Sequence, residues 1–289
     1  MRLFITGATG FIGSHVMAAA LAAGHHVLAM RRHPQSNSVV PLPCQPEWIE
    51  GDIASLEASK LKGFDVVLHL AAAGVSPKIA SWHELLQANV VSSLRLLELV
   101  ESAGVPRCVV AGTCHEYGTS ALRYPAIPPD APLEPLNAYG ASKAAAFHMI
   151  RGFAIKQDLE LFYGRIFTAY GEGQYSENFW PSLKRAAASG KDFPMTSGKQ
   201  ISDFIPVALS AGYLLRACDR PDMSPGIPLV ANIGTGQPKS LLAFAETEWE
   251  RLEATGRLMP SSLQDRPDQI YHMVADTRGL EIPPSSLPC

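Results

Sequence analysis

The 289-residue sequence predicts an α/β fold, a doubly wound parallel sheet accompanied by a smaller C-terminal region. Three observations favour this fold class. Short apolar strands alternate with helical segments through the first third of the chain. The first strand runs directly into glycines at positions 7, 10 and 13, which open a helix. A second strand follows that helix at once, and such a βαβ unit requires parallel strands joined by a right-handed crossover.

The composition narrows the classes of function. The chain is 47% hydrophobic and 18% charged, and is long enough to bury a sizeable core. A formal net charge of −3 argues against nucleic acid as a partner, and neither a basic run nor a long apolar span indicates a membrane. The five cysteines are widely spaced and include no Cys-x-x-Cys pair, which argues against a disulfide framework and against a metal site. We therefore expect a cytoplasmic globular protein without a signal peptide.

The expected elements follow one another closely. Residues 3–6 form a buried strand, residues 11–23 an alanine-rich helix that Gly24 stops, and residues 27–30 a second strand. Further strands are expected at residues 48–51, 66–70 and 108–112, and a long helix at residues 82–103. Because these strands are parallel, their carboxyl ends share the edge of the sheet at which ligands bind.

The glycine turn at that edge has the spacing of a phosphate-binding turn. Gly7 allows the sharp turn out of the strand, Gly10 lets the backbone approach a pyrophosphate, and Gly13 lets the helix pack closely on the sheet. A purely architectural turn is the alternative. The residues expected to contact a dinucleotide here are Gly7, Thr9, Gly10, Phe11, Ile12 and Gly13.

Two arginines after the second strand bear on the choice of cofactor. An Asp or Glu at this place usually meets a free ribose 2′-hydroxyl, whereas the guanidinium groups of Arg31 and Arg32 suit a 2′-phosphate. NADP is therefore expected rather than NAD, unless the arginines are simply solvated. Asp52, with Ile53 beside it, could accept a hydrogen bond from the adenine amine, or could cap the following turn.

Small residues after the strand at residues 66–70 would let a flat cofactor lie against the backbone. Asn89 interrupts the apolar pattern of the next helix, where a polar side chain is often only a hydrogen-bonded part of the core. The remaining predicted cofactor contacts are Leu70, Ala71, Ala72, Ala73, Asn89, Tyr139, Lys143 and Ile166.

The candidate catalytic residues lie in the middle of the chain. Tyr139 and Lys143 are four residues apart, so on a helix they share one face, where the ammonium could lower the pKa of the phenol. Thr113 ends a predicted strand and could donate a hydrogen bond to a carbonyl oxygen. Together the three residues indicate proton transfer coupled to hydride transfer.

The combined motifs resemble the extended short-chain dehydrogenases/reductases of the nucleotide-sugar epimerase/dehydratase type. They stand in the family's order: Thr6-Gly-x-x-Gly-x-x-Gly13, Gly51-Asp52, His69-Leu-Ala-Ala72, Asn89, Thr113, Tyr117-Gly118, Tyr139-x-x-x-Lys143, Arg165, Tyr170-Gly171 and Asn232-x-Gly-Thr-Gly236. The resemblance implies a Rossmann domain over residues 1–165, to which residues 200–235 return. It also implies a substrate-binding region over residues 166–199 and 236–289, a nucleoside-diphosphate sugar as substrate, and a homodimer built on the helices after Trp82 and Tyr139.

Departures from the family's pattern narrow the expected reaction. The 4,6-dehydratases of this family carry Asp and Glu after the catalytic threonine, where this chain has Cys114 and His115, so dehydration is not expected. Strand alternation would place Thr113 and His115 on the substrate side and Cys114 elsewhere. His115 stands where GDP-fucose synthases carry an acid/base cysteine, and could contact or protonate a sugar, or could only be hydrogen-bonded at a strand end. Glu116 is expected to be structural.

The substrate region departs from the family as well. Thr168 stands where relatives often have Asn, and Ser202 replaces an arginine that would meet the diphosphate. The resemblance implies Thr113, His115, Thr168, Asn178, Phe193 and Arg266 as substrate contacts. Apolar core is the alternative for Phe193, and an exposed loop charge is the alternative for Arg266.

The resulting hypothesis is an NADP-dependent reductase acting on the 4-keto group of a nucleotide-linked deoxysugar. Tyr139 would protonate the keto oxygen, and Thr113 would orient the carbonyl. Lys143 would lower the pKa of the Tyr139 phenol and hold the ribose. Two alternatives stay open. One is a nucleotide-sugar 4-epimerase that retains NAD, and the other is a non-catalytic NADP-binding sensor.

Overall fold

The computed structural model describes residues 1–75, 80–265 and 270–280, and its main sheet holds seven parallel strands in the order β10-β6-β5-β4-β1-β2-β3. The strands are β1 (Arg2–Thr6), β2 (His26–Arg31), β3 (Glu47–Glu50), β4 (Val66–His69), β5 (Arg107–Thr113), β6 (Glu160–Ile166) and β10 (Leu229–Ile233). The order reverses direction at β1 and β4, as in a doubly wound sheet, so the predicted fold class is confirmed.

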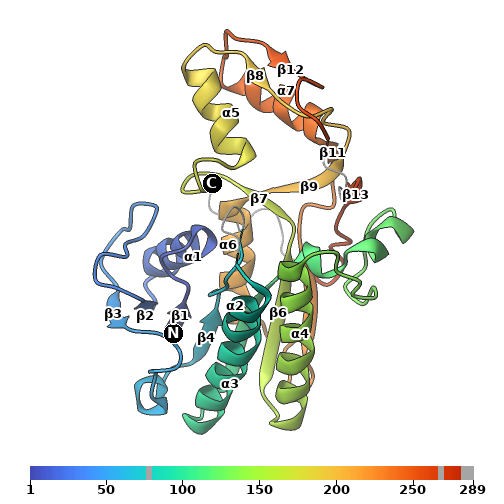
Figure 1. The fold of residues 1–289 in the computed structure, drawn as a ribbon. Coiled ribbons are helices and arrows are strands. Elements are labelled where there is room, and N and C mark those ends of the chain that lie inside the picture. The colour runs from blue at the N-terminus through green and yellow to red at the C-terminus, as the bar shows by residue number, and fades with distance from the viewer. Residues whose placement is uncertain (76–79, 266–269, 281–289) are drawn as a thin grey trace.

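Helices cover both faces of this sheet (Figure 1). On one face α1 (Phe11–Ala22) packs against α6 (Val207–Arg216), and on the other α3 (Ser92–Ser102) packs against α4 (Ala138–Lys156). Two separate apolar clusters fill these layers, one on each side of the strands. The strands are buried on both faces, which is why they read as continuous apolar runs.

The helix predicted for residues 82–103 contains a change of helical type. It begins as α2 (Trp82–Leu85), continues as the π-helical segment η2 (Leu86–Val91) and ends as α3. Ser81 caps its start, and Glu84 returns the capping bond. A π-helical turn rotates the side chains that follow it and often marks a functional site. Asn89 lies in this turn.

The remaining elements gather at one end of the large sheet (Figure 1). Two small sheets and two helices form this group: β7 (Thr168–Tyr170), β9 (Ile201–Pro206), β11 (Pro238–Ser240), β13 (His272–Met273), β8 (Phe193–Pro194), β12 (Leu258–Met259), α5 (Phe179–Ala188) and α7 (Leu241–Arg251). Short 3-10 helices complete the fold: η1 (Ala58–Leu61), η3 (Cys114–Glu116) and η4 (Thr119–Arg123). The division of the chain into two domains stays a prediction.

Asp203 joins the small sheet that contains β9 to the loop after β10. It is fully buried on β9, and its carboxylate accepts hydrogen bonds from Thr235 N and Oγ1 at 2.8 and 2.6 Å and from Gly236 N at 2.8 Å. A Cβ at Gly234 would lie 2.5 Å from Asp203 Oδ2. The glycines of this loop therefore make room for a buried carboxylate that would otherwise lack partners.

His69, at the end of β4, ties three elements together. Its Nδ1 lies 2.8 Å from Thr6 Oγ1 on β1, and its Nε2 lies 2.8 Å from Ser93 Oγ on α3. Because Ser93 donates its own proton to Asn89 O at 2.6 Å, it accepts from His69, and the imidazole is neutral with its proton on Nε2. Burial, with the charge of Lys143 nearby, lowers the pKa of His69 to about 3.

A buried ion pair lies between β5 and β6. Arg165 Nε donates to Glu116 Oε2 at 2.6 Å, and the two side chains are 1% and 0% exposed. Glu116 Oε1 also accepts from Thr113 N and from Tyr163 Oη, each at 2.9 Å. Arg165 Nη1 donates to Pro129 O at 2.9 Å, and its guanidinium lies 4.3 Å from the Phe147 ring centroid. These contacts compensate the cost of removing both charges from water.

Along the parts of the chain that the structure describes, no helix is both long and apolar enough to cross a bilayer.

The buried imidazole makes stability depend on pH. Below pH 6.5 the unfolded chain binds a proton at His69 that the folded chain does not bind, so this contribution is complete above pH 6.5 and declines as the pH falls toward 3. Substituting His69→Gln should reduce the loss of stability between pH 7 and pH 5 by about 2 kcal/mol. Urea unfolding at pH 7 and at pH 5 measures this change in the free energy of unfolding. A His33→Gln variant, at an exposed site, should keep the parent's pH dependence.

Removing one member of the buried pair should be costly. Arg165→Met leaves Glu116 charged and unpaired, and should lower the free energy of unfolding by about 3–5 kcal/mol. Arg107 pairs with Glu160 at the opposite end of the same two strands, but that pair is partly exposed, so Arg107→Met should cost clearly less. Denaturant unfolding compares the two variants. Equal losses would contradict the importance assigned to the buried pair, and adding Glu116→Gln to Arg165→Met should restore part of the loss.

Candidate active site

The glycine turn has the close contacts that the sequence predicts. Gly7 has a φ of +70°, and a Cβ on it would lie 2.6 Å from Ala71 N at the end of β4. A Cβ on Gly13 would lie 2.0 Å from Gly7 O, so only glycine lets α1 start this close to the turn. Gly10 meets no such obstacle nearer than 3.2 Å. Positions 7 and 13 thus require glycine for packing, and a Cβ at position 10 would make a close but less severe contact with the same Gly7 O.

The first turn of α1 offers unpaired backbone donors. Gly10 is the N-cap residue in an extended conformation, and no side chain caps the helix. The N–H groups of Phe11 and Ile12 therefore lack the intrahelical and capping partners that later residues have. With Thr9 only partly buried beside them, the turn fits the pyrophosphate of a dinucleotide.

Arg31 and Arg32 have different surroundings. Arg31 donates from Nη2 to Glu50 Oε1 at 2.9 Å, and its guanidinium lies 4.8 Å from the ring centroid of Trp48, so the side chain is only 16% exposed. Arg32 is exposed and, among the described residues, has no hydrogen bond or ion pair. Arg31 would therefore meet a 2′-phosphate only in competition with Glu50 of the neighbouring strand β3, and a contact of either arginine with the cofactor stays a prediction.

Asp52 caps a turn. Its Oδ1 accepts from Ser55 N at 3.0 Å, and its own N–H donates to Ser55 Oγ at 3.2 Å. These backbone and side-chain bonds from Ser55 lower the pKa of Asp52. Ile53 is buried against the core and is 8% exposed. Capping was the alternative that the sequence left open, and a contact with adenine stays a prediction.

Asn89 fastens the segment after β4 to α4. Its Oδ1 accepts from Ala73 N at 2.8 Å, while Nδ2 donates to Ala73 O at 3.1 Å and to Ser142 Oγ at 2.9 Å. The side chain is 1% exposed and is bonded to these partners, and a direct contact between Asn89 and a cofactor stays a prediction. Asn89 holds Ala73 and thereby the segment of Leu70, Ala71, Ala72 and Ala73, which are partly exposed residues.

The strand and helix ends bring the candidate catalytic residues together. Thr113 ends β5 beside Ile166, which ends β6. Tyr139 lies in the first turn of α4, close enough to the side chain of Thr113 for that side chain to act toward a lower pKa of the phenol, against the larger effect of burial. A Cβ at Gly140 would lie 2.5 Å from His115 O, so glycine lets α4 approach this turn.

Burial dominates the electrostatics of the pair on α4. It raises the pKa of Tyr139, and the charge of Glu116 raises it further. Burial lowers the pKa of Lys143, with Glu116 opposing that effect, and the ammonium donates to Ala111 O at 2.9 Å. The expected lowering of the phenol pKa by Lys143 is therefore not found: Lys143 is held on the backbone of β5, and Tyr139 is a protonated phenol at neutral pH.

The residues after Thr113 form the 3-10 helix η3 and do not continue the strand. The expectation of strand alternation is wrong, because Thr113 Oγ1 accepts from His115 N at 3.3 Å and Glu116 closes a capping box. Cys114 still points inward: it is 5% exposed, and burial raises the pKa of its thiol to about 12. His115 keeps an exposed surface as a residue, but its ring lies over the start of α4, with its centroid 6.2 Å from that of Tyr139, and desolvation of the ring by the surrounding protein lowers its pKa.

The predicted substrate contacts are placed separately. Thr168 opens β7, and Asn178 is the N-cap residue of α5 without a side-chain capping bond. The ring of Phe193 packs at 5.5 Å from Phe179 and 6.3 Å from Trp249, which makes it part of an apolar cluster, the alternative that the sequence left open. Arg266 lies outside the described residues.

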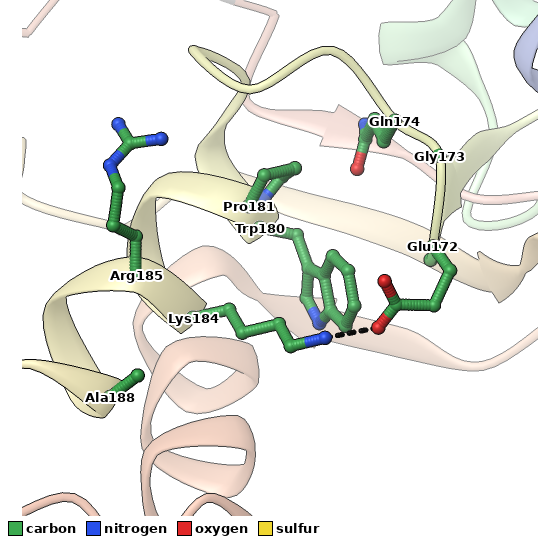
Figure 2. A pocket seen from close by; sticks show the side chains of 9 residues that line it. Glu172, Gly173, Gln174, Trp180, Pro181, Lys184, Arg185 and Ala188 are labelled. Carbon is green, nitrogen blue, oxygen red and sulfur yellow. Dashed lines mark hydrogen bonds and ion pairs between the residues drawn. The ribbon is translucent and has the colours of Figure 1, made fainter. Parts of the chain in front are cut away.

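A cavity of about 290 Å³ opens where the loop after β7 meets α5 (Figure 2). Lys184 reaches across it to the carboxylate of Glu172, and the Trp180 ring lies beside both. Thr168, Asn178 and Phe193 do not line this cavity. It is therefore separate from the predicted substrate contacts.

Several residues that hold the site were not singled out as functional from the sequence. Thr6, Ser93 and Ser142 position His69 and Asn89 through the hydrogen bonds above. Their signal is a polar residue within a continuous apolar pattern, which requires a partner once buried. Across the described residues, no group of three or more His, Cys, Asp or Glu side chains is arranged to hold a metal ion.

Known proteins resemble the chain along most of its length. The sequence pattern of the NAD dependent epimerase/dehydratase family matches residues 3–234. A UDP-glucose 4-epimerase from Corynebacterium glutamicum is 28% identical over 284 residues, which cover 92% of this chain and 84% of that protein. A dTDP-6-deoxy-L-talose 4-dehydrogenase (NAD(+)) from Aggregatibacter actinomycetemcomitans is 28% identical over 256 residues, covering 85% and 88%.

A solved structure is also similar to this chain along most of its length. MoeE5 in complex with UDP-glucuronic acid and NAD is 31% identical, has a TM-score of 0.81, and aligns over 97% of this chain and 91% of that one. The resemblance inferred from the motifs is confirmed. The protein is thus an NAD-dependent enzyme of the extended short-chain dehydrogenase/reductase type, and it belongs to the NAD dependent epimerase/dehydratase family.

Proposed function

We propose that the protein catalyses hydride transfer between NAD and C4 of a nucleoside-diphosphate sugar, and that it acts as a 4-epimerase. The observation that carries this proposal is the contact between Tyr139 and Thr113 at the end of β5, with the buried Lys143 one helical turn away. The names of the similar proteins support the substrate class, since they include 4-epimerases and a 4-dehydrogenase of nucleotide sugars.

The chain's own residues supply proton transfer and orientation. In the first half-reaction hydride leaves C4 while the C4 hydroxyl gives up its proton, so Tyr139 must enter this step as the phenolate; the protonated phenol, which burial favours, then returns that proton to the C4 keto oxygen in the second half-reaction. Thr113 directs that oxygen by hydrogen bonding. The positive charge of Lys143 stabilises the phenolate while it exists, even though burial raises the resting pKa. Bound NAD supplies the hydride acceptor and donor.

The proposed contacts of the cofactor follow the glycine turn and the segment that Asn89 holds. The N–H groups at the start of α1 would bind the pyrophosphate, the backbone at residues 70–73 would face the cofactor, and Lys143 would hold a ribose hydroxyl. His115 would contact the sugar as a neutral imidazole, because its pKa is lowered. Dehydration finds no support here, since the buried thiol of Cys114 cannot act as an acid or base near neutrality.

A second candidate function is reduction of a 4-keto sugar by NADPH. The exposed guanidinium of Arg32 at the end of β2 favours it, because it is free among the described residues to meet a 2′-phosphate. The 4-dehydrogenase among the similar proteins favours the same type of reaction, although with NAD.

We further propose that the protein forms a homodimer through α4 and the helix that starts at Trp82. Large apolar side chains are exposed along these helices: Trp82 at 70%, Leu86 and Val91 at 47%, Met149 at 45% and Ile155 at 43%. Exposed apolar side chains on helices that pack against each other support an interface at this place.

Removing the phenol tests the proposed chemistry. Tyr139→Phe should lower kcat about 10²–10⁴-fold, because it removes the proton donor and leaves the ring in place. The assay follows interconversion of C4 epimers of UDP-sugars, and NAD binding is measured in parallel to show that the site is intact. Tyr175→Phe, at an exposed tyrosine, is the matched control. Full turnover by Tyr139→Phe would contradict the assignment.

The cofactor and the direction of reaction separate the two candidate functions. An epimerase should release NAD on denaturation and should interconvert epimers without net consumption of cofactor. A reductase should consume NADPH with a 4-keto sugar, and Arg32→Gln should then weaken NADPH by about tenfold or more, the loss of one charge-assisted contact. Arg31→Gln should have a smaller effect on NADPH, since Glu50 already holds that side chain.

A further inference from the structure

A second cavity, of about 480 Å³, opens beside α4 on the side of β10, and the catalytic residues and the glycine turn do not line it. The loop at residues 129–133 forms one wall, Phe147 and Arg151 of α4 form another, and Val230 of β10 closes it. Arg165 reaches it from β6 within the sheet. A volume of this size and a mostly apolar wall with a few polar groups are typical of sites for small organic molecules.

The charges around this cavity favour an anion. Arg151 is exposed, and among the described residues it has no hydrogen bond or ion pair. Arg165 adds a second guanidinium, which donates to protein partners from Nε and Nη1. The opposing carboxylate at the rim, Asp130, lies within the electrostatic range of Arg278, whose main partner is Asp276. Arg151 is therefore not paired with any carboxylate among the described residues, while Asp130 contributes a negative charge to the same, mostly apolar, cavity.

We propose that this cavity binds a small organic anion, a carboxylate attached to an aromatic or branched apolar body. Arg151 would pair with the carboxylate, since a guanidinium presents two parallel donors to it. Phe147 and Val230, with the proline-rich loop at residues 129–133, would contact the apolar body. His148 stands next to Arg151 on the rim and adds a further donor.

An anion bound at this site would affect the catalytic residues through a short chain of contacts. An anion in the cavity attracts Arg165, whose Nε holds Glu116, and Glu116 in turn holds Thr113 N. Any weakening of the bond between Arg165 and Glu116 loosens the support of Thr113. Bound anion should therefore lower kcat without competing for the cofactor or the sugar, and the coupling must be reciprocal in binding.

Calorimetry on the full chain tests the site without reference to turnover. The probe is 3-phenylpropionate, and 3-phenylpropanamide, which has the same shape without the charge, is the control ligand. The carboxylate should bind and the amide should not. Arg151→Gln should weaken the binding of the carboxylate by about tenfold or more, as expected for losing one charge-assisted pair. Lys156→Gln, on the same helix but outside the cavity, should bind like the parent.

Three results would overturn the proposal: no heat from the carboxylate, equal binding of the amide, or unchanged binding by Arg151→Gln. Sedimentation of the same variants tests the remaining possibility, that a second copy of this chain occupies the cavity. If Arg151→Gln weakens self-association and the probe does not bind, the cavity is covered by a second copy of this chain. Because binding is measured without substrate, an inactive Tyr139→Phe protein that still binds the probe would separate this site from the proposed function.

Discussion

The buried pair of Glu116 and Arg165 is the interaction on which the arrangement of the site depends. Two charges removed from water are tolerated only when their remaining donors and acceptors are used, and here the backbone of Thr113 and the hydroxyl of Tyr163 take part. The same carboxylate closes the turn after β5 and so directs Thr113 toward α4. One ion pair thereby couples the stability of β5 and β6 to the position of a proposed catalytic side chain.

The other half of the site is held by neutral hydrogen bonds. Asn89 joins Ala73, on the side of the cofactor turn, to Ser142, which lies between Tyr139 and Lys143 on α4. The π-helical segment gives Asn89 its direction, and His69 supports the same region through Ser93. The proposed cofactor contacts and the proposed catalytic residues are thus parts of one connected network, which limits how far either can move independently.

The differences between the sequence-based expectations and the structure have separate causes. The ion pair of Arg31 was not expected, because Glu50 lies on another strand and only becomes a neighbour through the register of β2 and β3. The pKa of Tyr139 was expected to fall because spacing places Lys143 on the same face, but spacing does not measure burial, which has the larger effect. The turn at Cys114 was expected to continue the strand, although Thr113-x-x-Glu116 has the local spacing of a capping box.

The sequence by itself determined the parallel α/β sheet, the glycine turn and the grouping of Thr113, Tyr139 and Lys143. Each depends on local rules: apolar periodicity, the absence of a Cβ, and the side chains that adjacent turns of a helix share. Only the tertiary structure decided which arginine stays exposed after β2, what Asn89 contacts, and how burial shifts each pKa. Those properties depend on partners more than fifteen residues away, whose distances local patterning does not specify.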